Sequence, residues 1–207
     1  MDLSAHFTNP EIIAMVVGAS FAAGLNIYAT VAALGLMGRF GMVPVPENLS
    51  TLTDWWVIGI ALALFSVEFF ADKIPAFDLI WNAMHTFIRV PAAALLGYAA
   101  TTQMSPKAQI AAAVLAGVVA LIAHGGKVAA RVAVSPSPEP VSNTTLSVAE
   151  DVAAVGLVWF ATTYPYVAAA IAVVLVIVIF FVARWVIRAM KRLFSSASRR
   201  LDDLMAA

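Results

Sequence analysis

The sequence of 207 residues contains no cysteine. Disulfides, thiolate zinc sites, iron–sulfur clusters and cysteine nucleophiles are therefore excluded. Charged residues are also few: they make up 12% of the chain, whereas a soluble domain carries about a quarter. Twelve basic residues cancel twelve acidic ones, so the composition gives no reason to expect a nucleic acid partner. These few charges are informative only through their positions.

The sequence motifs of several well-known protein classes are missing as well. The chain has no glycine-rich phosphate loop followed by lysine, no zincin motif, no serine-protease elbow and no arginine ladder of the voltage-sensor kind. The motifs therefore name no reaction, and they leave the cofactor and the metal unknown.

Hydrophobic residues, in contrast, make up 62% of the chain, and the mean hydropathy is +0.93. This much apolar surface cannot be hidden in a soluble core of this size, so the solvent must be lipid. A helix needs about 20 apolar residues to cross a bilayer. We therefore predict an all-α polytopic membrane protein with about six transmembrane helices: Ile12–Met37, Trp55–Ala71, Phe87–Thr102, Ala108–Val128, Val148–Thr162 and Tyr166–Val182.

The basic residues predict how the chain lies in the membrane. With both termini in the cytoplasm, ten basic residues fall inside and two outside, as the positive-inside rule requires. We therefore predict a multi-pass protein of the bacterial inner membrane with both termini cytoplasmic. Residues 1–190 would form one transmembrane domain, and 191–207 a basic amphipathic tail on anionic lipid. The inner group is Lys73, Arg89, Lys127, Arg131, Arg184, Arg188, Lys191, Arg192, Arg199 and Arg200, and the outer group is Arg39 and Lys107.

Two inner connections follow from this orientation. From Phe77, apolar residues recur at helical spacing, while Asp78, Asn82, His85 and Arg89 line the opposite side. This pattern predicts an interfacial amphipathic helix with a polar stripe. The second connection, 134–145, carries three prolines and is expected to be irregular.

A two-helix unit occurs twice if the chain is shifted by 61 positions, which places Thr101-Thr102 on Thr162-Thr163. Spans two and three would then match spans four and five. Alanine-rich sequences align easily by chance, so a true duplication stays open. The alignment places Arg89 opposite Glu150 and predicts a salt bridge between the two halves.

Span two ends in Glu68, Asp72 and Lys73. Glu68 and Asp72 lie one turn apart on one face, and Glu68 lies inside the membrane boundary, where ionisable groups are expensive and usually mark a pathway or a paired site. Two states of Glu68 are open: protonated, or held ionised by Lys127 or Arg131. In both, we expect Glu68 to face span four.

Span four carries His124, Lys127 and Arg131 on one face at its inner end. The helix C-terminus and the inner membrane surface favour both cations without any function. The protonation range of His124 makes it the informative member, although a purely structural histidine is equally compatible with the pattern.

The segment Ser147-Val-Ala-Glu150 has the spacing of a capping box at a helix start. The box explains Glu150 but not Asp151. In span one, Asn26 lies mid-membrane near Tyr28. The span is long, so it must tilt or break. A break at Asn26 would expose backbone groups for an ion or a polar substrate, whereas close helix packing with an interhelical amide hydrogen bond is the alternative.

Four motifs together resemble a bacterial family of integral membrane proteins, domain of unknown function family 4126. The resemblance extends to about Arg192 and implies a six-helix protein of the inner membrane. The motifs are Gly24-Leu-Asn26-Ile-Tyr28-Ala-Thr30, Glu68 to Pro75 with Asp78, His124-Gly-Gly-Lys127 with Arg131, and Ser147-Val-Ala-Glu150-Asp151.

The leading hypothesis is a small transporter or lipid flippase with a polar site in the cytoplasmic half. The expected binding residues are Asn26, Glu68, Asp72, His124, Lys127 and Arg131, supported by Tyr28, Lys73, Asp78, His85, Arg89, Glu150 and Asp151. Expected partners are membrane lipids and an anionic solute or head group, and a homo-oligomer stays open.

Two other function classes remain. Carboxylates of Asp72, Asp78 and Asp151 would hold a divalent cation in an enzyme acting on a lipid phosphate. A non-catalytic assembly subunit is the third class, and it would be favoured if the polar residues paired with one another.

Overall fold

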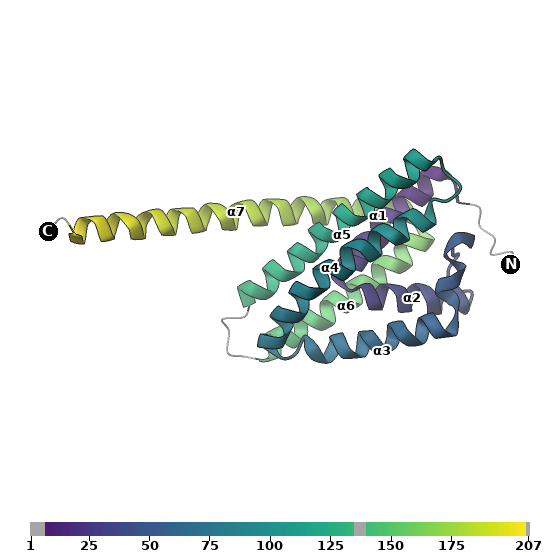
Figure 1. Cartoon of the computed structure of the whole chain (residues 1–207), viewed down its shortest axis with the longest axis horizontal. Helices are drawn as coiled ribbons and strands as arrows, with labels where there is room; N and C mark the ends of the chain where they lie inside the picture. Colours follow the sequence, from purple (N-terminus) through teal and green to yellow (C-terminus); the bar gives the residue numbers. More distant parts are fainter. Residues whose placement is uncertain (1–6, 135–139, 206–207) are drawn as a thin grey trace.

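A computed structural model describes residues 7–134 and 140–205. Side chains of 75–79, 132–134, 140–143 and 189–205 lie outside this description. The described residues form no strand. Their helices are α1 (Asn9–Leu25), α2 (Ile27–Arg39), the short 3-10 helix η1 (Glu47–Thr53), α3 (Trp55–Ala71), α4 (Pro75–Ala100), α5 (Pro106–Val134), α6 (Pro140–Thr163) and α7 (Pro165–Met205), as Figure 1 shows.

Helix lengths and composition agree with a membrane protein. Pro106–Arg131, Thr144–Thr163 and Pro165–Arg188 are each long and apolar enough to cross a bilayer, and η1 with α3, bent by 63°, is a fourth candidate. Helices α1 and α2 are apolar but shorter. The predicted all-α membrane fold is therefore confirmed.

The first predicted span does not cross as one helix. Asn26 has extended backbone (φ −152°, ψ 106°) and ends α1 while it caps α2. Val16 of α1 lies by Gly97 of α4, which packs on Ala112 and Ala116 of α5. Gly24 lies further along α5, by Ala120, so α1 runs parallel to α5. Helix α2 then returns, since Gly35 lies against Ile58 at the start of α3. The chain therefore forms a re-entrant hairpin with its tip at Asn26.

This reversal changes the placement of the ends of the chain. Figure 1 shows the start of α1 at the end of the bundle where α4 finishes and α5 begins, and α7 projecting from the opposite side. On which side of a membrane each terminus lies stays a prediction. The sequence did not reveal the reversal, because a hairpin and one long helix have the same hydropathy profile.

The predicted interfacial helix is part of α4. Helix α4 is continuous from Pro75 through the third predicted span, with Pro91 inside it. Its polar stripe is buried, since Asn82, His85 and Arg89 are at most 3% exposed, whereas Phe87 is 82% exposed. The stripe was correctly predicted, but it faces protein instead of the membrane surface, because the solvent outside is apolar.

Two other local predictions are wrong. Helix α6 already begins at Pro140, so the second half of the predicted irregular connection is helical, while 135–139 lie outside the described residues. Ser147 therefore lies inside α6 and does not cap it. The helix starts at Pro140, and proline favours the first position of a helix. Helix α7 continues for 41 residues through the predicted tail.

Small residues let α1 lie in the centre of the bundle. Ala22 and Ala23 are fully buried. A Cβ atom at Gly24 would lie 2.4 Å from the Ala120 carbonyl oxygen, so only glycine permits this approach of α1 to α5. This packing brings the hairpin tip among the polar ends of the surrounding helices.

Candidate functional site

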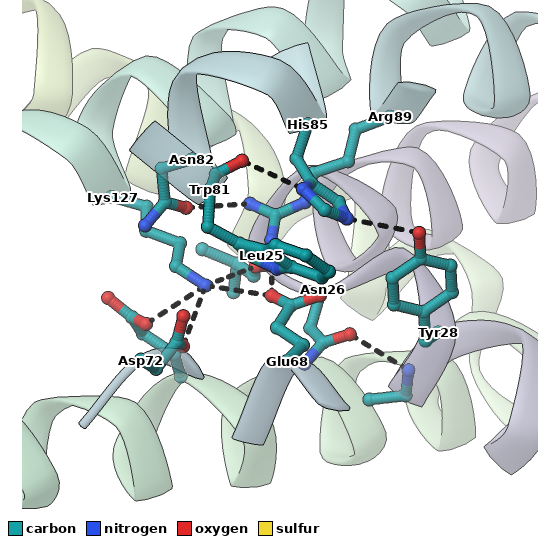
Figure 2. A network of polar contacts seen from close by, with 12 residues as sticks. Leu25, Asn26, Tyr28, Glu68, Asp72, Trp81, Asn82, His85, Arg89 and Lys127 are labelled. Carbon is teal, nitrogen blue, oxygen red and sulfur yellow. Dashed lines mark hydrogen bonds and ion pairs between the residues drawn. The ribbon is translucent and has the colours of Figure 1, made fainter. Parts of the chain in front are cut away.

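Six ionisable residues meet where the hairpin tip reaches the polar ends of α3 to α6. We call them the ion cluster, and the side chains of all six are at most 8% exposed. Figure 2 shows several of them converging beside Leu25 and Asn26. The members are Glu68 and Asp72 from the end of α3, Arg89 from α4, Lys127 and Arg131 from α5, and Glu150 from α6.

Glu68 lies between two cations. Its Oε1 atom accepts from Nη2 of Arg89 and lies 3.1 Å from Nζ of Lys127. Its Oε2 atom is buried without a hydrogen-bond partner among the described residues, as is Nε of Arg89. Glu68 thus faces α5 as predicted, with two cationic nitrogens on one of its oxygens.

Asp72 and Glu150 share the remaining cation of α5. Nη2 of Arg131 lies 2.9 Å from Asp72 Oδ2 and 2.7 Å from Glu150 Oε2. The hydroxyl of Ser147 also donates to Asp72, at 3.3 Å. These bonds tie α3, α5 and α6 together inside the bundle.

The predicted salt bridge between Arg89 and Glu150 does not form. Arg89 pairs with Glu68, 21 residues away, and Glu150 with Arg131, 19 residues away. Each pair therefore joins the descending and ascending helices within one two-helix unit, with the charges exchanged. A charged residue of each two-helix unit thus pairs with a residue on the adjacent helix of the same unit, and not with the residue at the equivalent position of the other unit. Whether the units are duplicates stays a prediction.

Lys127 is the centre of the ion cluster. Its Nζ lies 3.4 Å from both Asp72 Oδ2 and Glu150 Oε2, in addition to Glu68. It also donates to the Leu25 carbonyl oxygen, at 3.2 Å. That carbonyl belongs to the last turn of α1, where the helix dipole favours a cation. Lys127 thus links three carboxylates to the hairpin tip.

Two buried histidines join the polar network, and the ring of His124 is held neutral. Nη1 of Arg89 lies 2.7 Å from His124 Nδ1, and a guanidinium can only donate, so Nδ1 carries no proton. His124 Nε2 then donates to the Asn82 carbonyl, 3.0 Å away. His85 Nδ1 donates to the Trp81 carbonyl, and its Nε2 lies 3.0 Å from the Tyr28 hydroxyl, which can donate or accept.

Asn26 fixes the hairpin tip by its side chain. Its Oδ1 atom accepts from the Ala29 amide at 3.0 Å, as in a helix N-cap. Its Nδ2 atom donates to Asp151 Oδ1, at 2.8 Å, so Asp151 borders the ion cluster from α6. The break at Asn26 and the interhelical amide bond, which the sequence presented as alternatives, both occur.

One expected supporting residue, Lys73, does not join this arrangement, and the side chain of another is not described. Nζ of Lys73 donates to the Phe69 carbonyl and lies 3.0 Å from the centre of the Phe69 ring. It makes no ion pair with a described residue, and desolvation lowers its pKa. The side chain of Asp78 lies outside the described residues.

Sequence reasoning missed two members of the polar network. Asn82 receives a hydrogen bond from His124 through its backbone, and its side chain is 2% exposed. Its place in the α4 stripe was the signal. Ser147 was interpreted as a helix cap. Its hydrogen bond to Asp72 could be expected only if α6 were known to begin earlier in the chain.

The described side chains do not assemble a metal site: no group of three His, Asp or Glu lies close enough to hold an ion. The hypothesis of a metal-dependent enzyme therefore gains no support from them. What the arrangement does provide is six charges removed from water, which is expensive unless every member is paired. Such groups inside a membrane protein usually mark a pathway or a switch.

Comparison with known families supplies the chain's relationship but no chemistry. Neither the curated proteins nor the solved structures contain a match to it. The model of one family, described as Domain of unknown function (DUF4126), matches residues 13–185. This match covers most of the chain, including Asn26, the ion cluster and Asp151, and the protein therefore belongs to that family.

Proposed function

We propose that this protein is a small membrane transporter or lipid flippase whose polar site lies at the tip of the α1–α2 hairpin. One observation carries the proposal. A broken helix ends at Asn26 deep in the bundle, where its carbonyls meet charged side chains. Discontinuous helices with free ends facing a polar site are how transporters bind ions and polar substrates.

The ion cluster has the properties of a gate in this proposal. Its pairs hold α3 to α4, and α5 to both α3 and α6. Separating these helices would open the bundle to water at that end, where the charges regain hydration. In the closed state the charges are paired but desolvated, and in the open state they are hydrated but separated. The two states are therefore close in free energy, as an alternating mechanism needs.

An anionic substrate fits the cations of the gate. A carboxylate or phosphate group entering the open state would compete with Asp72 and Glu150 for Arg131, which presents a fork of donors. A lipid could approach through an apolar groove between α6 and α7 that reaches the tip. Its lining is Leu25, Ala153, Gly156, Leu157, Phe160, Ile171 and Leu175.

We place the cluster end on the cytoplasmic side of a bacterial inner membrane. The positive-inside argument is unchanged by the hairpin, because the first eight residues contain no lysine or arginine. The start of α1 then lies on the outer side, and α7 ends in the cytoplasm.

The test is reconstitution of the full chain into sealed liposomes. One arm follows scrambling of a fluorescent phosphatidylglycerol with a membrane-impermeant quencher, and the other follows uptake of labelled inorganic phosphate and succinate. We expect the wild type to exceed protein-free liposomes in one arm, and Lys127→Gln to abolish that flux. Lys107→Gln, an exposed lysine of the same helix, is the matched control. No flux of any of these probes would count against the proposal.

A non-catalytic assembly subunit is the second candidate, because the residues of the ion cluster do pair with one another. It predicts that the protein extracted in mild detergent retains one fixed partner chain in native mass spectrometry. Asp151 argues against it, since pairing within the cluster leaves this carboxylate unexplained.

A further inference from the structure

Asp151 differs from the other carboxylates at the site. Glu68, Asp72 and Glu150 each lie within 3.4 Å of two cationic nitrogens. Asp151 pairs with no cation among the described residues, and its one hydrogen bond comes from the neutral amide of Asn26. A buried carboxylate with one neutral donor is poorly compensated.

Counting the charges gives the same result. The ion cluster contains three cations and three carboxylates, so its formal charges cancel. His124 is neutral by its hydrogen bonds, His85 contacts only the Trp81 carbonyl and the Tyr28 hydroxyl, and Lys73 remains on the Phe69 ring. An ionised Asp151 would therefore add one unpaired negative charge to a closed, balanced site.

The groups around Asp151 do not remove this excess. Glu68 and Asp72 face it from α3 and repel a negative charge, while Lys127 from α5 attracts it but is already shared by three carboxylates. Lys73 at the end of α3 acts only from a distance. From the hairpin, Asn26 offers only its neutral amide group, oriented as a donor because its Oδ1 accepts from Ala29, and this cancels no charge.

We propose that Asp151 is the proton-binding residue of this protein, and that it holds one proton while the ion cluster is closed. The proton comes from hydronium in water on the cluster side, so an O–H bond forms on the carboxylate and one water is left. Asp151 is 9% exposed, the most accessible of the four carboxylates, which gives that proton a route.

The functional consequence of this inference rests on the proposed function. Opening the cluster hydrates Asp151 and releases the proton, so closing takes one up again. By linkage, the pH on the cluster side then biases the equilibrium between the closed and open states. Protonation of Asp151 accordingly controls opening, and its signal reaches the hairpin through the bond between Asp151 and Asn26.

The proton is measured directly by infrared titration of the full chain in liposomes. We expect the C=O band of one protonated carboxyl per chain at mildly acidic pH, which Asp151→Asn abolishes and Asp151→Glu retains. Glu47→Gln, an exposed carboxyl, is the control and leaves the band in place. Aspartate labelled with carbon-13 in the wild type must shift the band, which shows in the unaltered protein that the carboxyl belongs to an aspartate, and retention of the band in Asp151→Glu shows that a variant at this position folds.

Absence of the band, or its survival in Asp151→Asn, overturns the inference. The proposed function is tested separately by flux. If the band is assigned to Asp151 but no probe shows flux, the proton site stands and the proposed transporter function is refuted. If flux occurs and Asp151→Asn leaves it equally dependent on the pH of the cluster side, the transporter stands and this controlling role of Asp151 is refuted.

Discussion

Replacing Glu68 by glutamine is expected to destabilise the protein strongly, although glutamine keeps the shape of the side chain. The substitution removes the negative charge that Arg89 and Lys127 share. Lys127 retains Asp72 and Glu150. Arg89 retains no carboxylate among the described residues, only His124, Asn82 and a backbone carbonyl.

The size of the effect follows from this stranded charge. Breaking a buried ion pair by removing one partner costs about 3–5 kcal/mol. At roughly 2–4 °C per kcal/mol for a chain of this size, the apparent melting temperature should fall by about 6–20 °C. Asp151→Asn, also a change from carboxyl to amide, breaks no ion pair and should shift it by less than about 3 °C.

A second substitution identifies the stranded residue. Glu68→Gln with Arg89→Gln removes both charges and should recover most of the loss, whereas Glu68→Gln with Lys127→Gln should recover little. All variants are melted in one detergent and lipid mixture at one scan rate, because unfolding of membrane proteins is commonly irreversible. Equal effects of Glu68→Gln and Asp151→Asn would refute the argument.

Two further predictions concern packing and the arginine of α5. Gly24→Ala should reduce the folded yield severely, because its Cβ would meet the Ala120 carbonyl, whereas Gly125→Ala has open space and should be neutral in size-exclusion chromatography; equal yields would contradict the close approach. Arg131→Lys keeps the charge but loses the fork toward Glu150, so we expect a drop of about 1–3 kcal/mol in stability, read as a melting temperature; an unchanged melting temperature would contradict it.

The sequence predicted the chemistry of the site better than its geometry. Glu68, Asp72, His124, Lys127 and Arg131 were singled out because ionisable residues at the ends of apolar runs are expensive, and the structure brings them together. The free-energy cost of burying an ionisable group identifies such residues, since it depends on local surroundings that the sequence shows. Their pairing partners were harder to predict, because pairing depends on which helices are neighbours.

The path of the first segment could not be predicted in the same way. Hydropathy records how apolar a residue is and carries no direction, so Ile12–Met37 reads equally as one crossing or as a hairpin. Asn26 was the one local signal, as a polar amide in an apolar run. The direction of α2 is decided by long-range contacts, such as Gly35 with the carbonyl of Leu52, which no local pattern encodes.

Membrane sidedness of the hairpin arms is the most direct test of the account. The absence of native cysteines allows single cysteines to be introduced without further changes. Asn9→Cys, Gln103→Cys and Ile74→Cys are all at exposed positions. In sealed vesicles of one orientation, a membrane-impermeant thiol reagent should treat Asn9→Cys and Gln103→Cys alike and Ile74→Cys oppositely. If Asn9→Cys instead follows Ile74→Cys, then α1 and α2 form one crossing and the tip at Asn26 does not exist.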